Sequence, residues 1–281
     1  MRWVRHADLD SFMEAAGDHL RADPLLNQMP LGFVATLRAE PSRYGPEVRL
    51  RTVHAPGGEC VGAAVQTPPW KAQLSRMDLG AAAFAGAAYA EEQPGYGGAM
   101  GSGEVAAAFV AAGFARVGAA GIEEDARMGM YALTEVAEIR RAKGQMRPAE
   151  AGDAPLLQRW TVAFHDEAVP MDPAPGPGAG ERYATSGKAR IWLDEVGDTV
   201  AFANHPREVE GFLSIGPVYT PPELRGQGYA TSLVAAMCDA ALAAGKRGCT
   251  LFADVKNPTS NAIYQRIGFR RMGEVARFVY R

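Results

Sequence analysis

With 281 residues, of which 47% are hydrophobic and 22% charged, the chain is long enough for two domains and apolar enough to bury a core in each. Its formal net charge of -3 argues against a protein that binds nucleic acid by neutralising phosphates. Cys60, Cys238 and Cys249 are too few and too scattered for a disulfide framework or a zinc site. These features favour a cytoplasmic protein with reduced thiols and no bound metal.

The sequence gives no sign of a membrane protein. The first ten residues, MRWVRHADLD, carry charges throughout and lack the apolar centre of a signal peptide. The most apolar stretch, LGAAAFAGAAYA at residues 79–90, is well short of the roughly 20 residues that cross a bilayer. We therefore expect a soluble chain.

The first half of the chain predicts a helix, a hairpin and a second helix. Residues 9–22 space their apolar side chains at helical intervals. Residues 47–55 and 59–67 alternate like strands around a Pro-Gly-Gly turn, which predicts a β-hairpin. A glycine-rich loop around Gly98 then leads into an alanine-rich helix. Residues 127–136 predict a closing strand, which a charged connector follows.

The second half begins again with a helix. Its predicted elements are a helix at 154–169, a Pro/Gly-rich loop at 171–183, strands at 189–196, 199–205 and 208–220, a helix at 229–244, a strand at 248–255, a short helix at 260–267 and a strand at 274–281. The strand at 208–220 is interrupted by Gly216-Pro217. A similar order of elements in both halves indicates a divergent duplication.

The stretch VYTPPELRGQGYATSLV, residues 218–234, places small residues where a helix must begin. Glycine inside a helix costs about 1 kcal/mol relative to alanine. The first turn of a helix leaves backbone N–H groups without partners, and the helix dipole favours an anion there. Small residues let that anion come close, so the stretch predicts a phosphate site.

Two motifs then lie about 30 residues apart with a helix and a strand between them. Residues 225–230 fit the pattern R/Q-x-x-G-x-G/A, and NPTSNAIYQRIGF follows at residues 257–269. Over most of residues 147–281 the chain resembles the GCN5-related N-acetyltransferase (GNAT) family. The resemblance implies an α/β fold of the α+β kind, with tandem acyl-CoA N-acyltransferase-like domains, each a mixed, mostly antiparallel sheet flanked by helices. We expect residues 144–281 to be the catalytic domain and residues 1–143 a degenerate relative.

The resemblance also implies an acetyl-CoA site. Main-chain N–H groups of residues 226–231 would bind the diphosphate, and the main chain of Val218 and Thr220 would bind the pantetheine arm. The expected cofactor-binding residues are Val218, Thr220, Arg225, Gly226, Gln227, Gly228, Tyr229, Ala230, Thr231, Asn257 and Asn261. Structural alternatives stay open for the two asparagines, an Asn-Pro turn for Asn257 and a helix N-cap for Asn261.

The expected chemistry is direct transfer of an acetyl group from acetyl-CoA to a primary amine of a small molecule or peptide. By the resemblance, Tyr264 would protonate the departing thiolate, since a phenol with a pKa of about 10 stays protonated at neutral pH. The alternative is a core aromatic. Glu167 is a candidate base for the amine, and water would serve as well. The sequence does not identify the acceptor amine. It also leaves the oligomeric state open, and a homodimer is one possibility.

Two other functions remain open beside this one. A non-catalytic acyl-CoA sensor would use the same loop without transfer. An NAD-dependent oxidoreductase is less favoured, because Thr231 stands where a third glycine is needed.

In the first half, Gly98, Gly101 and Gly103 copy the glycine spacing, but Glu104 puts a negative charge at the helix start. That charge predicts a degenerate site.

Overall fold

The computed structural model describes residues 1–281, and the chain divides into two compact units. The first unit comprises Met1–Met130 and Met272–Arg281, and the second comprises Tyr131–Arg271. These limits differ from the single expected boundary after residue 143. The charged connector lies in the second unit, and the end of the chain lies in the first.

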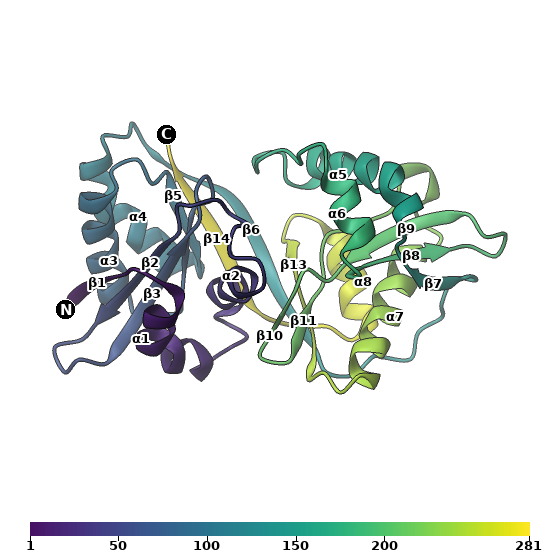
Figure 1. The fold of residues 1–281 in the computed structure, drawn as a ribbon, viewed down its shortest axis with the longest axis horizontal. Coiled ribbons are helices and arrows are strands. Elements are labelled where there is room, and N and C mark those ends of the chain that lie inside the picture. The colour runs from purple at the N-terminus through teal and green to yellow at the C-terminus, as the bar shows by residue number, and fades with distance from the viewer. The chain divides into compact units, whose positions relative to one another are not determined.

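The first unit is built on a mixed sheet with helices on both faces (Figure 1). Its strand order is β1-β2-β3-β4-β5-β14-β6, in which β4 and β5 run parallel. The strands are β1 Arg2–His6, β2 Arg49–His54, β3 Cys60–Gln66, β4 Ala72–Leu74, β5 Gly98–Gly101, β6 Ile122–Leu133 and β14 Arg270–Tyr280. The helices are α1 Leu9–Ala22, α2 Gln28–Ala39, α3 Leu79–Glu92 and α4 Gly103–Val117.

Small residues decide how the helices of this unit pack. Helices α3 and α4 are rich in alanine, and their core includes Ala85, Tyr89 and Phe109. A Cβ on Gly86 of α3 would lie 1.9 Å from the carbonyl oxygen of Phe109, so only glycine permits this approach. Asp8 caps the start of helix α1, because its side chain accepts a hydrogen bond from the Ser11 N–H at 2.8 Å.

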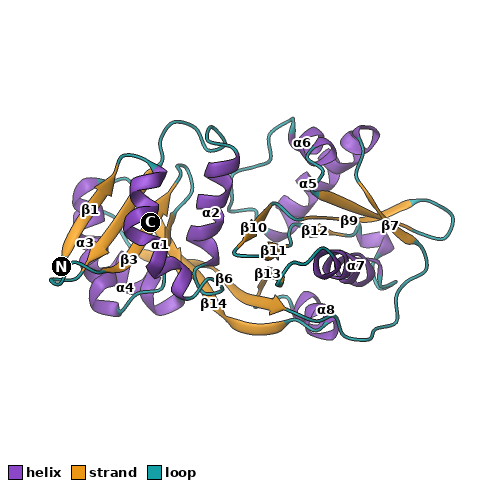
Figure 2. Cartoon of the chain, turned by 60° about the horizontal axis from the view of Figure 1, so that its bottom comes forward, coloured by secondary structure: helices purple, strands orange, loops and turns teal.

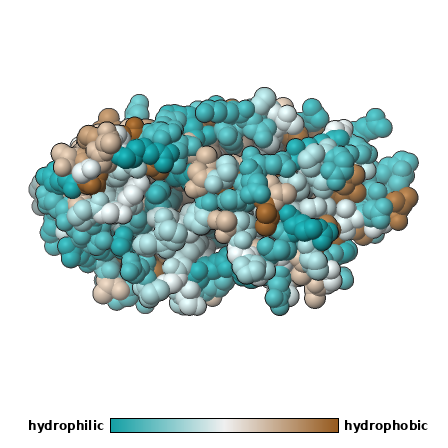
Figure 3. Space-filling model, turned by 90° about the horizontal axis from the view of Figure 1, so that it is seen from above, coloured by the Kyte–Doolittle hydropathy of each residue, from teal (hydrophilic) through white to brown (hydrophobic).

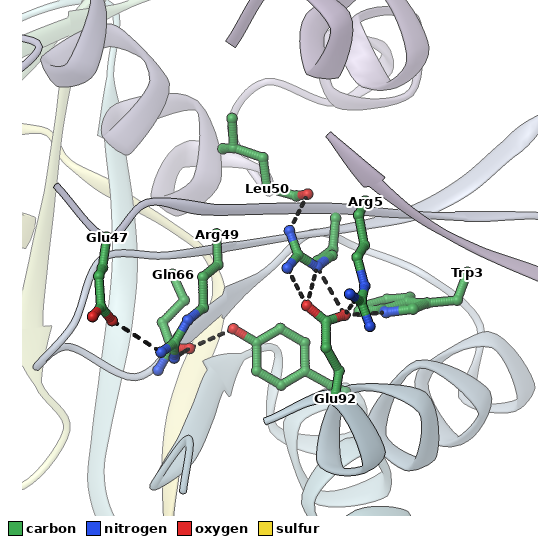
Figure 4. Close-up of polar contacts among 9 residues, drawn as sticks. Trp3, Arg5, Glu47, Arg49, Leu50, Gln66 and Glu92 are labelled. Carbon is green, nitrogen blue, oxygen red and sulfur yellow. Dashed lines mark hydrogen bonds and ion pairs between the residues drawn. The ribbon is translucent and has the colours of Figure 1, made fainter. Parts of the chain in front are cut away.

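A buried polar cluster ties β1 and β2 to the end of α3 (Figure 4). Glu92 accepts hydrogen bonds from Trp3 Nε1 at 3.0 Å and from Arg51 Nε at 2.9 Å, and pairs with Arg5 at 3.1 Å. Burial alone would raise the pKa of Glu92, but the hydrogen bonds from Arg51 and Trp3 outweigh it and hold that pKa below its usual value. Arg5 and Arg51 share the single carboxylate of Glu92, and each of these side chains finds its partners within the fold, which marks the cluster as structural.

The second unit contains two sheets. The first has the order β6-β13-β11-β10, entered by residues 131–133 of β6, and the second has the order β12-β9-β8-β7. The strands are β7 Gln145–Pro148, β8 Ala189–Leu193, β9 Thr199–Asn204, β10 Arg207–Val209, β11 Phe212–Ser214, β12 Val218–Tyr219 and β13 Gly248–Asp254. The helices are α5 Ala154–Ala168, α6 Ala179–Thr185, α7 Tyr229–Ala243 and α8 Pro258–Ile267.

Alternating side chains on β8 and β9 give the four-stranded sheet two apolar faces. Ile191 and Phe202 belong to a core with α5 and α6, whereas Trp192 and Ala201 belong to a core with α7. Figure 2 shows α5 and α6 on one side of these strands and α7 on the other. This layering places the start of α7 beside β12.

The expectation of a mixed sheet flanked by helices is confirmed. Helix α1 and the β2–β3 hairpin form where the periodicity predicts them. The predicted strand at 208–220 is divided into β10, β11 and β12, and the helices α2, α3 and α6 were not predicted. None of the helices is both long and apolar enough to span a bilayer. On the face seen in Figure 3, apolar residues are scattered among hydrophilic ones.

Candidate functional site

Strands β11 and β13 part in the second unit, and we call the place where their pairing ends the slot. The two strands pair in parallel from Phe212 with Gly248 to Ser214 with Thr250. Ile215 N–H donates to the carbonyl of Thr250 at 2.8 Å, and beyond this bond the chain turns to pair with β9 instead. The rest of β13 therefore loses its neighbour on this side.

Strand β12 borders the slot with its main chain. Asn204 N–H on β9 donates to the carbonyl of Pro217 at 3.1 Å, and Val218 is the next residue. Bonds to one neighbour alternate along an antiparallel strand, so the polar groups of Val218 and Thr220 face away from β9. The Oγ1 atom of Thr220 is buried without a hydrogen-bond partner. These are the groups expected to bind the pantetheine arm.

Two glycines shape the loop before α7. Gly226 has a φ of 81° and Gly228 a φ of 82°, a left-handed conformation that favours glycine. A Cβ on Gly226 would meet nothing within 4 Å, and one on Gly228 would meet only the Ala142 Cβ, at 4.0 Å. The space above the loop is therefore open, and the need for glycine comes from the backbone.

The start of α7 has main-chain donors without acceptors. Gly228 is the N-cap residue and offers no side chain, and the first helical bond runs from Ser232 N–H to the Gly228 carbonyl at 2.9 Å. The N–H groups of residues 226–231 find no acceptor in the protein. Together with the positive end of the helix dipole they form a cradle for an anion.

The charged connector that contains Ala142 supports the loop before α7. The sequence analysis did not predict this contact. The Ala142 N–H donates to Ser232 Oγ at 2.7 Å, and that hydroxyl donates to the Gly228 carbonyl at 2.9 Å. Ser232 is completely buried. No motif marks Ala142, because its role depends only on where the connector runs.

Arg225 is held beside the loop by an acidic partner. Its Nη2 atom lies 2.6 Å from Oε2 of Glu167 on α5, and its Nε donates to the Thr220 carbonyl at 2.9 Å. Glu167 also accepts a hydrogen bond from the Tyr219 hydroxyl at 3.1 Å. Gln227 stays exposed and accepts from the Tyr229 hydroxyl at 3.0 Å. The candidate base thus lies against the candidate phosphate-binding arginine.

The two asparagines hold the turn from β13 into α8. Asn257 is the N-cap, and its Oδ1 accepts from Ser260 N–H at 3.0 Å. Asn261 donates from Nδ2 to the carbonyls of Asp254 at 2.9 Å and Asn257 at 2.8 Å. The capping role left open for Asn261 therefore belongs to Asn257. Tyr131, which no motif indicated, donates its hydroxyl proton to Asn261 Oδ1 at 2.7 Å.

Replacing Tyr131 with phenylalanine should lower the free energy of unfolding by about 1 kcal/mol, because Asn261 Oδ1 loses its donor. Denaturant unfolding of the full chain measures this. Tyr44→Phe is the control, since the Tyr44 hydroxyl makes no hydrogen bond and its loss should cost less than about 0.5 kcal/mol. Equal stability of the two variants would refute a supporting role for Tyr131.

Tyr264 lies on α8, half-buried, with its ring packed edge-on against Phe269 at 6.0 Å between centroids. Its hydroxyl has no hydrogen-bond partner in the protein. Burial raises the pKa of Tyr264 to about 12, so the phenol is protonated at all physiological pH values. It is a free donor that the fold itself does not use.

In the first unit, the helix start that corresponds to the start of α7 is that of α3, and its N-cap residue is Asp78 instead of a glycine. The parallel strands β4 and β5 flank α3 as β11 and β13 flank α7. At the start of α3, the carboxylate of Asp78 accepts a hydrogen bond from Ala81 N–H at 2.7 Å. That charge occupies the place of an incoming anion. Gly98 lies elsewhere, at the start of β5, where a Cβ would meet the Phe278 carbonyl at 2.1 Å.

Comparisons with known proteins bear on the fold of the chain. Residues 198–279 match the family model described as FR47-like protein. A comparison with curated proteins finds no match. A solved acetyltransferase of the GNAT family from Colwellia psychrerythraea is 13% identical, with a TM-score of 0.58 and 100% of both chains covered.

Two further solved structures extend the likeness. A GCN5-related N-acetyltransferase from Sphaerobacter thermophilus is 17% identical, with a TM-score of 0.60, and the match covers 98% of this chain and 94% of that one. A tandem GNAT protein from the clavulanic acid biosynthesis pathway is 14% identical, with a TM-score of 0.55, covering 99% and 97%. The chain therefore has the tandem fold of the GNAT acetyltransferases, and the resemblance expected from two motifs is confirmed.

Proposed function

We propose that this chain is an N-acetyltransferase that moves an acetyl group from acetyl-CoA to a primary amine by direct transfer in a ternary complex. The observation that carries this proposal is the cradle of unpaired N–H groups at residues 226–231, which lies next to the slot between β12 and β13. A diphosphate fits the cradle and an extended pantetheine arm fits the slot. The orphaned Oγ1 of Thr220 offers the arm a further hydrogen bond.

Each residue then has a defined task. Thr231 and the loop before it hold the diphosphate through the main chain, with Arg225 at its border. Main-chain groups of Val218 and Thr220 align the arm as a neighbouring strand would. The amine nitrogen forms a bond to the acetyl carbonyl carbon while the bond from that carbon to sulfur breaks, and Tyr264 gives its phenolic proton to the sulfur. The nitrogen then loses a proton to water to become the amide nitrogen, and a proton from water restores the phenol.

The ammonium of the acceptor must lose a proton before it attacks. Glu167 is the candidate base, but it forms an ion pair with Arg225 and accepts from Tyr219. Both oxygens of its carboxylate therefore already accept hydrogen bonds, Oε1 from Tyr219 and Oε2 from Arg225, and neither is free to accept a proton from the acceptor amine. We therefore favour water as the immediate proton acceptor, with Glu167 positioning Arg225.

We further propose that the second unit is the catalytic part and that the first unit is a degenerate relative. Asp78 supports this assignment, because its carboxylate already caps the helix that would otherwise face phosphate. The three cysteines form no disulfide, and we propose a reducing, cytoplasmic setting for the chain.

Ligand-dependent melting of the full chain tests the cofactor. Acetyl-CoA at about 100 times its Kd should stabilise the protein by about 2.7 kcal/mol and raise its melting temperature, whereas NAD at the same concentration should not. The chain lacks the third glycine of a dinucleotide loop, since Thr231 stands there. Protection by NAD alone would overturn the proposal.

Release of free thiol from acetyl-CoA across a panel of primary amines tests the reaction. Turnover that saturates with one class of amine is the expected result. Saturable binding of acetyl-CoA with no thiol release from any amine would instead mean a non-catalytic acyl-CoA sensor.

A further inference from the structure

The second unit contains a cavity of about 180 Å³ that the proposed reaction does not use. It lies between the C-terminal half of α7 and strands β7, β8 and β11, and α7 packs against β7 and β8 (Figure 2). Tyr229, at the cradle, and Ala244, at the cavity, are separated by about 22 Å along the helix axis. The cavity is therefore separate from the proposed acetyl-CoA site.

One wall of the cavity carries a half-buried cation without a carboxylate partner. Arg190 on β8 donates from Nη1 to the carbonyls of Gly187 at 2.7 Å and Ala189 at 2.9 Å. Its Nε and Nη2 groups have no acceptor in the protein. Burial lowers the pKa of Arg190, which reflects the loss of water around the charge. A half-buried guanidinium with free donors is a binding site for an oxyanion.

The other charged groups at this wall leave an excess of positive charge. His205 lines the cavity, and burial first and then Arg190 and Lys188 lower its pKa to about 4. Lys246 is paired with Glu208 at 2.7 Å, and the charge of Glu208 opposes the lowering of the His205 pKa. An anion in the cavity would therefore meet one lining cation that no carboxylate compensates, Arg190.

Much of the remaining lining is apolar. Met146 and Leu213 contribute to it from β7 and β11, and Met237, Ala241 and the exposed Ala240 contribute from α7. The last carbonyls of α7 are not directed to a ligand, because the N–H groups of residues 244–246 cap them. An engineered 150 Å³ cavity holds benzene, so a cavity of this size fits about seven non-hydrogen atoms.

We infer that this cavity binds a short-chain aliphatic monocarboxylate, whose carboxylate pairs with Arg190 and whose alkyl chain packs against α7. A five-carbon acid has the matching size. A phosphate ion would leave the apolar wall uncovered, and a neutral ligand would leave Arg190 unpaired. This site does not depend on the proposed acetyl transfer.

Titration of the full chain with valerate, followed by NMR of the His205 ring, tests this inference. Valerate should bind, and the pKa of His205 should rise from about 4, because a nearby anion favours the charged imidazole. His205→Gln assigns the resonance. Pentanamide has the same shape without the charge and should bind at least about tenfold more weakly.

Two variants locate the site. Arg190→Met keeps the stem and removes the charge, and Ala240→Leu fills the cavity from an exposed position that tolerates leucine. Each should weaken valerate binding at least about tenfold. Arg266→Met, at an exposed arginine outside the cavity, should leave it unchanged. Thermal melting checks that all three variants fold.

Three results would overturn the inference. They are the absence of valerate binding to the wild-type chain, equal affinity for valerate and pentanamide, and undiminished binding in the folded Arg190→Met variant. Loss of binding in Ala240→Leu alone would also count against it, because an anion site must respond to the removal of the cation.

Discussion

Replacing Gly228 with valine is expected to abolish acetyl-CoA binding, lowering the affinity by at least about a hundredfold. Gly228 has a φ of 82°, which costs a non-glycine residue about 1–2 kcal/mol and a β-branched one more. If the loop relaxes to relieve this strain, the N–H groups of residues 226–231 no longer point together at the proposed position of the diphosphate. If it does not, the valine methyl groups stand over them. Calorimetric titration with acetyl-CoA measures the loss.

The free protein should tolerate this change. The nearest protein atom to a Cβ at Gly228 is the Ala142 Cβ at 4.0 Å, so the new side chain meets little in the fold. Gly245→Val is a matched control at the other end of α7, because Gly245 has a φ of 77° and nothing within 4 Å of its Cβ position. It should suffer similar strain and keep its affinity for acetyl-CoA within about twofold. Undiminished binding in Gly228→Val would show that the phosphate cradle lies elsewhere.

Replacing Tyr264 with phenylalanine should lower kcat about 100- to 1,000-fold and leave the affinity for acetyl-CoA within about twofold. The phenol gives its proton only as the bond from carbon to sulfur breaks, so its loss affects the transition state and not the bound ground state. The fold loses little, because the hydroxyl has no partner in the protein. Steady-state kinetics with the best amine of the panel measures kcat.

Tyr44→Phe is the matched control for this experiment. The Tyr44 hydroxyl makes no hydrogen bond and belongs to the first unit, outside the proposed acetyl-CoA site, so kcat should stay within about threefold. Equal losses of kcat in the two variants would remove Tyr264 from its proposed role.

The pH dependence gives an independent check on Tyr264. A general acid must be protonated, so activity is present below its pKa and lost above it. Burial raises the pKa of Tyr264 to about 12, which moves that loss far above neutral pH. Between about pH 8 and about pH 10, deprotonation of Tyr264 should cause no loss of kcat. The result to look for is a decline of kcat that the wild-type chain shows in this range and the Tyr264→Phe variant does not. Such a decline would mean that Tyr264 titrates like an exposed phenol.

A fragment that contains only the region with the two motifs would lack contacts that support the proposed site. A fragment starting at residue 147 would lose the Tyr131 hydroxyl from Asn261 and the Ala142 N–H from Ser232. It would also leave β14 without β5, with which it pairs from Ala276 with Gly101 to Val279 with Gly98. Activity assays therefore need the full chain.

The sequence by itself determined the features that depend on near neighbours. Gly226 and Gly228 adopt left-handed backbone at the start of a helix, where the small-residue loop predicted an anion site. The apolar spacing predicted α7 and α1, because helical periodicity is a local property. The sequence also predicted the strand interruption at Gly216-Pro217, which lies between the end of β11 and the start of β12.

Only the tertiary structure decided which distant segments support that loop. Periodicity shows which side of an element is apolar but not which element covers it, so the place of β14 beside β5 could not be predicted. Tyr131 and Ala142 contact the site through single hydrogen bonds to Asn261 and Ser232, across long separations in the sequence. Such contacts leave no repeat or motif, because one donor at the right point in space is enough.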